Sequence, residues 1–404
     1  MIDHTHYVPI LRRRAAEVAA VTNLLNEDFA NITPFFELCE HILTPEKREK
    51  LLRIDSEIYF YEVIKELAGC CEFKPYFIDF GYVEGLFSRK DNRHMLEVYF
   101  DLLDHHHCKA IPVTGLSRSD SYQNGISQCL RRWGTGMCLR LTQRDIREPT
   151  FVLRLNMLLR NFDIGPRDVD LLVDLGIYRD SNPSYEEISD RIPMLREWKS
   201  FIVACGSFPE DLSDLAKNDE HKLPRSDWQR WLDLLMSQSR PRRIPTFADY
   251  TIQFPRRPEP LSFIPRTSAS IRYTARDHWV VMRGEWLNNP HGAGFDQYWG
   301  LANSLMSRPE YSGEDFSFGD QYIARIGSQN RLTGNISTWL QAGLNRHMTL
   351  TVRQISQAIS SAKFGQQSLR PLQRFPLRPH WNERRLVLPA SHHEQYMFPP
   401  EAWL

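Results

Sequence analysis

The sequence predicts an α/β protein: residues 1–255 form a (β/α)8 TIM-like barrel, and a small α+β C-terminal domain follows. Short apolar runs recur about every 30 to 40 residues, and a longer amphipathic stretch follows each of them. Eight such units in about 250 residues is the usual size of this barrel. A doubly wound open sheet is the main alternative. It more often has about five or six strands, and no glycine-rich phosphate loop follows the first run.

The expected strands are the apolar runs at residues 7–11, 32–38, 75–80, 109–114, 137–142, 169–175, 201–205 and 245–252. The helices expected after the first seven strands cover residues 15–25, 45–67, 91–105, 121–133, 150–162, 185–198 and 226–236. Thr44 is a suitable N-cap for the second helix, because Pro45 and Glu46 follow it. In the seventh helix, Trp228, Trp231 and Leu235 share one face.

The rest of the chain divides into a linker, a small domain and a tail. Residues 256–268 are rich in proline and lack periodicity, which is typical of a linker. The domain at 269–362 is expected to contain a strand at 271–282 and helices at 295–305, 336–347 and 352–361, with a strand or helix at 318–326. Residues 363–404 form an expected extended or partly disordered tail.

The composition argues against several classes of protein. Lys plus Arg and Asp plus Glu both number 50, so nucleic acid is not expected as a partner. The tail arginines are the only support for it: Arg370, Arg374, Arg378, Arg384 and Arg385. The seven cysteines lack zinc-ligand spacing, which favours reduced thiols in the cytoplasm. We see no signal peptide, and no apolar run approaches the roughly 20 residues that span a bilayer.

Charged residues at the ends of the expected strands are the candidates for chemistry, because active sites of such barrels lie at the carboxyl ends of the strands. The candidate catalytic residues are Glu37, Asp79, Asp174 and Asp249. The candidate ligand-binding residues are Arg12, Arg14, Thr114, Arg118, Arg140, Ser207 and Tyr250. The acids could hold a divalent cation of unknown identity while the arginines hold a phosphate. The simpler interpretation, which we favour, is that acids and arginines neutralise one another.

Further residues of types that often bind ligands or metals lie in two loops, in a histidine run and in the second domain. The loops 114–118 and 205–209 each carry glycine and serine after a strand, and can present N–H groups to an anion. The run His105, His106 and His107 is not expected to bind metal, because successive helical side chains point about 100° apart. In the second domain, Arg283, Asp320 and His347 are candidates for a polar site.

Several motifs together resemble the beta protein family, a group of bacterial and bacteriophage proteins. They are Tyr7-Val-Pro-Ile-Leu11, Ile32-Thr-Pro-Phe-Phe-Glu37, Ala248-Asp-Tyr250, Phe316-Ser-Phe-Gly-Asp320, Trp339 and Asn345-Arg-His347. In similar proteins a Lys-rich stretch and a glutamate follow the first strand, and Arg12 to Arg14 and Glu17 stand there in this chain. The family also tends to Asn-His-His where this chain has Arg346 in the middle. The resemblance implies a role in phage–host conflict but no established reaction.

Three functions remain open from the sequence. The protein is a ligand-binding or sensor barrel of a phage-defence or phage–host conflict system, with an anionic ligand or divalent metal at the barrel mouth and a protein partner on the C-terminal domain. Alternatively, it is a metal-dependent hydrolase acting on a phosphorylated or nucleotide-like substrate. The third function, nucleic-acid binding, is disfavoured by the balanced charge. We lean to the first.

Overall fold

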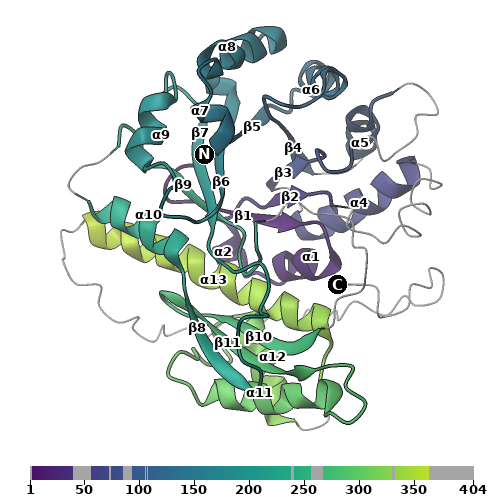
Figure 1. Ribbon diagram of the computed structural model, residues 1–404. Helices are drawn as coiled ribbons and strands as arrows, with labels where there is room; N and C mark the ends of the chain where they lie inside the picture. The colour runs from purple at the N-terminus through teal and green to yellow at the C-terminus, as the bar shows by residue number, and fades with distance from the viewer. Residues whose placement is uncertain are drawn as a thin grey trace.

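The computed structural model describes residues 2–39, 56–71, 74–84, 93–104, 106, 108–237, 241–255, 267–329 and 333–363. Among them, eight parallel strands close into a barrel, which confirms the predicted fold (Figure 1). In order around the barrel they are β1 (Tyr7–Arg12), β2 (Phe35–Glu37), β3 (Pro75–Asp79), β4 (Lys109–Thr114), β5 (Met137–Thr142), β6 (Val169–Ile177), β7 (Ser200–Gly206) and β9 (Thr246–Asp249). Pairing of β1 with both β2 and β9 closes the ring.

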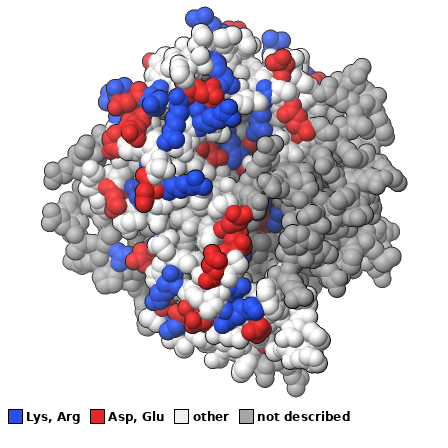
Figure 2. Space-filling view, in the orientation of Figure 1, with Lys and Arg blue, Asp and Glu red and all other residues white. Residues whose placement is uncertain are grey.

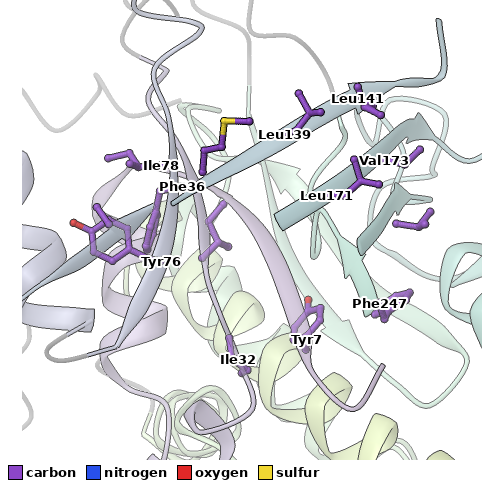
Figure 3. Packing of buried hydrophobic residues seen from close by; sticks show 14 of the residues in the cluster. Tyr7, Ile32, Phe36, Tyr76, Ile78, Leu139, Leu141, Leu171, Val173 and Phe247 are labelled. Atoms are coloured by element: carbon purple, nitrogen blue, oxygen red, sulfur yellow. The ribbon is translucent and has the colours of Figure 1, made fainter. Parts of the chain in front are cut away.

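Alternation along each strand divides the apolar side chains between two cores. One set fills the lumen and includes Val8, Ile10, Phe35, Phe77 and Ile202. The other packs between the strands and the surrounding helices, where Figure 3 shows Tyr7, Phe36, Tyr76, Leu171 and Phe247. Since successive side chains of a strand point to opposite faces, a strand-end residue in step with the lumen set faces the barrel mouth.

Helices follow the first seven barrel strands in turn. They are α1 (Ala15–Thr22), α4 (Ser56–Cys71), α5 (Met95–Leu103), α6 (Asp120–Trp133), α8 (Phe151–Phe162), α9 (Tyr185–Arg191) and α10 (Ser226–Met236), with the shorter α2 (Asn26–Phe29), α7 (Gln143–Arg147) and η2 (Pro166–Asp168) between them. Helix α9 ends before the expected residue 198, because Ile192 precedes Pro193, and a residue before proline disfavours the α conformation. The expected start of α4, with Thr44 as its cap, lies outside the described residues.

The segment after β9 contains a hairpin and three helices. They are β10 (Ser268–Thr274), β11 (His278–Trp286), η3 (Gly294–Asp296), α11 (Gln297–Met306), α12 (Phe318–Ser328) and α13 (Ile336–Lys363). The single strand expected at 271–282 was therefore wrong, since a turn at 275–277 divides it. The two helices expected after residue 336 form one, because no glycine or proline interrupts residues 344–363. Residues 318–326 are helical, with Ser317 as the cap.

A further strand that the sequence did not predict, β8 (Asp219–Pro224), lies between β7 and α10 in the chain and pairs with β11. It completes a three-stranded sheet in the order β10-β11-β8. Its sequence is almost entirely polar, so it lacks the apolar run that marks the barrel strands. The apolar side chains of β10 form a second core with those of α11 and α12, including Ile271, Tyr273 and Tyr298.

Helix α13 occupies the place of the barrel's eighth helix. It packs against α1, α10 and β1, and Leu344, Met348 and Ile355 belong to the outer core of the barrel. Figure 1 shows it running between the barrel and the small sheet. The hairpin, α11 and α12 are thus an insertion between the eighth barrel strand and its helix. The proposed division of the chain at residue 255 stays a prediction, and the long last helix serves both parts.

The expected linker falls outside the described residues except for 267 and 268, and so does the tail beyond 363, with its arginines. Across the part of the chain that the structure describes, no helix is both long and apolar enough to cross a membrane.

Candidate functional site

Arg140 lies at the centre of the barrel mouth and donates hydrogen bonds to residues from four other strands or strand ends. Its Nη1 donates to Glu37 Oε1 at 2.7 Å and to Asp79 Oδ2 at 3.0 Å. Its Nη2 donates to Asp174 Oδ2 at 2.7 Å and to the Tyr250 hydroxyl at 3.0 Å, and its Nε also reaches Asp174. A guanidinium group presents several donors in one rigid plane, so Arg140 joins three carboxylates at once.

Strand alternation explains why these side chains meet. Glu37 is two residues after Phe35, Asp79 two after Phe77, and Asp174 two after Leu172, and all three preceding residues belong to the lumen core. Arg140 and Tyr250 follow the lumen residues Cys138 and Ala248 in the same way. Since each strand ends at the same face of the barrel, the five side chains converge there.

The network is buried, which changes the pKa of its members. Burial raises the pKa of Glu37, and Arg140 beside it only partly offsets this. Burial would also raise the pKa of Asp79, but Arg118 and Arg140 hold it below its usual value. Burial opposes the charge of Arg140, yet Tyr250, Asp174 and the other acids raise its pKa well above normal. The network therefore contains two carboxyl groups whose pKa values are shifted in opposite directions.

Arg118 forms an ion pair with Asp79. Its Nη2 lies 2.7 and 2.8 Å from the two oxygens of Asp79, and its guanidinium stacks 5.3 Å from the ring centre of Tyr122. Gly81 leaves room for this guanidinium, because a Cβ atom at that position would collide with it. The Arg118 side chain is 21% exposed, whereas that of Asp79 is 1% exposed. Arg118 is thus the cation of this network that reaches toward solvent.

Tyr82 belongs to this site but was not predicted. Burial and the nearby charge of Glu37 raise its pKa, with Asp79 and Asp174 adding to the effect. It lies in the turn after β3, three residues beyond the strand-end acid Asp79. That position was the available signal, since loops at the carboxyl ends of barrel strands carry site residues.

The remaining candidates do not join the Arg140 network through hydrogen bonds. The Thr114 hydroxyl donates to Gln123 at 2.8 Å, and the Ser207 hydroxyl donates to Asp227 at 2.6 Å. Arg12 Nη2 donates to the carbonyl of Phe254, although the charge of Arg12 is close enough to lower the pKa of Glu37. Arg14 precedes α1 as its N-cap, without a side-chain capping bond.

Four acids were expected to converge at the barrel mouth, but Asp249 does not join the other three. This residue is two after Phe247, which belongs to the outer core, so its carboxylate points away from the lumen. There Asp249 accepts from the Tyr7 hydroxyl at 2.6 Å and lies 2.8 Å from His347 Nε2 on α13. It therefore anchors the last helix to the outside of the barrel.

The polar site suggested for the second domain is also not assembled. Arg283 donates to the carbonyls of Leu212 and Leu215, Asp320 pairs with Arg346 at 3.4 Å, and His347 contacts Asp249. Each of the three candidates thus has different partners. Their burial is better explained by the junction between the insertion and the barrel, which these contacts hold together.

A divalent metal does not fit the acids of the mouth as they stand, because the guanidinium of Arg140 lies between Glu37, Asp79 and Asp174. The described residues include no group of three or more His, Cys, Asp or Glu side chains placed to hold a metal ion. His105 and His107 of the histidine run lie outside the described residues, and His106 packs beside the ring of Tyr61.

These features define an eight-stranded parallel α/β barrel with a buried ionic network at its mouth and an insertion before its last helix. The chain belongs to the beta protein family, because the family model described as "Beta protein" matches residues 7–353. That match covers the barrel and most of α13, as the resemblance predicted. A search of curated proteins finds none that matches the chain.

Proposed function

We propose that this protein is a ligand-binding or sensor barrel whose mouth binds a small anionic ligand through Arg118. One observation carries the proposal. Only Nη2 of Arg118 is paired with Asp79, and Nε and Nη1 donate to none of the described residues although the side chain is partly exposed. An arginine that is fixed by a buried carboxylate, is partly exposed and has further donors without a partner among the described residues is suited to binding a phosphate or carboxylate.

The wider charge distribution supports a small ligand rather than nucleic acid. On the face shown in Figure 2, Lys and Arg side chains lie among Asp and Glu side chains in both the upper and lower parts of the view. The whole chain carries equal numbers of basic and acidic residues. Binding to a polyanion usually needs a continuous basic surface, whereas a single phosphate needs one or two arginines.

Arg118→Gln should weaken the binding of a phosphorylated ligand about tenfold, which corresponds to roughly 1.4 kcal/mol. The measurement is the shift of the thermal midpoint with inorganic phosphate, nucleotides, sugar phosphates and divalent metals, since a bound ligand stabilises the folded state. Arg132→Gln is the matched control, because Arg132 also pairs with one acid and stacks on an aromatic ring, but on α6. Equal losses in the two variants, or no shift with any ligand, would contradict the proposal.

The biological role that we propose is in phage–host conflict, and family membership is its support. The location that we propose is the cytoplasm. The seven free cysteine thiols favour it, because disulfides are rare in that compartment. For a sensor, we expect the protein partner on the insertion, where Phe295 and Trp299 are exposed.

Bacteria that express the chain should show reduced plaque formation by at least some phages, and Asp174→Asn should abolish the effect by loosening the Arg140 network. Plating efficiency measures this, with immunoblotting to show equal protein levels. Unchanged plating with every phage of a broad panel would contradict the proposed role.

The alternative, a metal-dependent hydrolase of a phosphorylated or nucleotide-like substrate, is favoured by one observation. Glu37 and Asp79 both accept a hydrogen bond from Nη1 of Arg140, but the pKa of Glu37 is raised and that of Asp79 is lowered. Such pairs serve as acid and base in many enzymes. The metal would have to bind elsewhere or displace Arg140. Turnover of a ligand found in the binding panel would favour this alternative over the sensor.

A further inference from the structure

Arg272, on the inserted hairpin, lies at the rim of the barrel mouth. In β10, Ala269, Ile271 and Tyr273 face the core of the insertion, so Arg272 points to the opposite side. There its guanidinium lies 5.0 Å from the ring centre of Phe208, and its Nη1 donates to the carbonyl of Ile252 at 3.0 Å. Phe208 follows the carboxyl end of β7 and Ile252 follows that of β9, which places Arg272 on the mouth side of the barrel.

No carboxylate among the described residues pairs with Arg272. Its Nε and Nη2 donate to none of these residues, and the side chain is partly exposed. Burial is the main cause that lowers its pKa to about 10, and the positive charge of nearby Arg12 contributes to this shift although Tyr298 opposes it. A partly desolvated cation next to a second cation is costly, and the negative charge of a bound ligand would reduce this cost.

The segment after β9 brings the two arginines together. Arg272 donates to the carbonyl of Ile252, and Arg12 donates to the carbonyl of Phe254 at 2.9 Å. The residue between them, Gln253, donates to Glu17 at 3.1 Å. Both arginines therefore donate to carbonyls two residues apart in one short stretch of backbone. Arg12 comes from β1 and Arg272 from the insertion.

Glu17 is a buried acid beside the same stretch of backbone, because Gln253 donates to it. It is fully buried in the first turn of α1, and its Oε2 has no hydrogen-bond partner among the described residues. Burial raises its pKa, although Arg14 and Arg12 favour the charged form. Buried polar atoms without a partner are uncommon in folded proteins, so this oxygen calls for an explanation.

We propose that Arg272 and Arg12 form a phosphate subsite at the rim of the barrel mouth, which binds the phosphate of a phosphorylated small molecule. Arg272 supplies the free donors, and Arg12 adds positive charge. The subsite rests on the proposed function, because it would hold one end of the same anionic ligand whose other end reaches Arg118. The insertion then has a role in recognition, since it carries Arg272 to the barrel.

The test is an NMR titration of the full chain with inorganic pyrophosphate, monitoring arginine Nε–Hε resonances. Arg272→Gln and Arg118→Gln assign the two resonances by their disappearance. The expected result is a saturable shift of the Arg272 resonance. In Arg272→Gln, the same titration followed at the Arg12 Nε–Hε resonance, which Arg12→Gln assigns, should give a pyrophosphate affinity at least fivefold weaker than in the wild type. Arg243 is the internal control, because it also donates only to carbonyls, those of Leu195, Trp198 and Lys199, before β7 at the other end of the barrel.

The outcomes separate the subsite from the wider proposal. If the Arg118 resonance shifts and the Arg272 resonance does not, the subsite is wrong and the proposed function stands. If Arg272 and the control Arg243 shift equally, pyrophosphate binds arginines nonspecifically and the subsite is again wrong. If neither Arg118 nor Arg272 responds, both proposals fail. Should Arg272→Gln not fold, Arg272→Lys keeps the charge and still removes the Nε resonance.

Discussion

Replacing Arg140 with methionine should lower the free energy of unfolding by about 3–5 kcal/mol, because three carboxylates lose their shared partner inside the barrel. Glu37 and Asp79 are almost fully buried, and Arg140 itself is 9% exposed. Methionine fills much of the volume of the arginine stem but supplies no positive charge. The loss therefore reports mainly the cost of uncompensated negative charge rather than of a cavity.

Urea denaturation at several pH values measures this effect. The destabilisation should be largest at neutral pH and should shrink as the pH falls, because protonation removes the repulsion between the carboxylates. Glu37 should protonate first, since its pKa is already raised by burial. The matched control is Arg144→Met, whose side chain is 90% exposed and forms an i,i+4 pair with Glu148. We expect a change within about 0.5 kcal/mol there. A similar small change in Arg140→Met would show that the network does not support the fold.

Much of this network could have been predicted from the sequence by alternation. The apolar runs located all eight barrel strands, and the acids at their ends follow directly. Counting in twos from the lumen residues separates Glu37, Asp79 and Asp174 from Asp249, which lies in step with the outer residue Phe247. Once one lumen residue per strand is known, the sequence alone separates the acids that face the lumen from Asp249. A list of strand ends alone does not make this distinction.

The rest of the site depends on contacts between distant parts of the chain. Alternation places Arg140 and Arg12 in step with the lumen residues Cys138 and Ile10, but it does not tell which arginine takes the central position, because the barrel closure decides which side chain reaches the axis. Similarly, the polar strand β8 is stabilised by pairing with β11, far along the chain. Helix α13 was expected in two pieces within a separate domain, and its packing on α1 and α10 follows from the vacant eighth helix position.

The junction of α13 with the barrel contains a second buried group of charges, centred on Asp249 and Asp227. Asp249 contacts His347 and Tyr7, while Asp227 on α10 accepts from Ser207 and from the backbone N–H of Trp228 through Oδ1. The other oxygen of Asp227 is buried without a hydrogen-bond partner among the described residues. Burial and the negative charge of Asp249 raise the pKa of Asp227 to about 6, although Arg225 nearby opposes this.

Asp227→Asn should therefore stabilise the protein above pH 7, by about 2–3 kcal/mol, and should have little effect at pH 4. The pKa of Asp227 in the folded state, about 6, exceeds its usual value of 3.8, so the folded state binds a proton that the unfolded state has released. The stability that protonation of Asp227 contributes is present at low pH and is lost as the pH rises from the usual value of 3.8 to about 6. Asparagine resembles the protonated acid: it can still accept from Ser207 and Trp228, and it carries no charge.

Free energies of unfolding for the two proteins from pH 4 to 8 measure the difference. Asp233→Asn on the same helix is the control, since Asp233 is exposed and bonded to Gln229. Its curve should run parallel to that of the wild type. If Asp227→Asn instead destabilises the protein at pH 8, the carboxylate is charged in the native state and its attraction to Arg225 outweighs burial. The junction would then depend on the attraction between Asp227 and Arg225 rather than on a protonated Asp227.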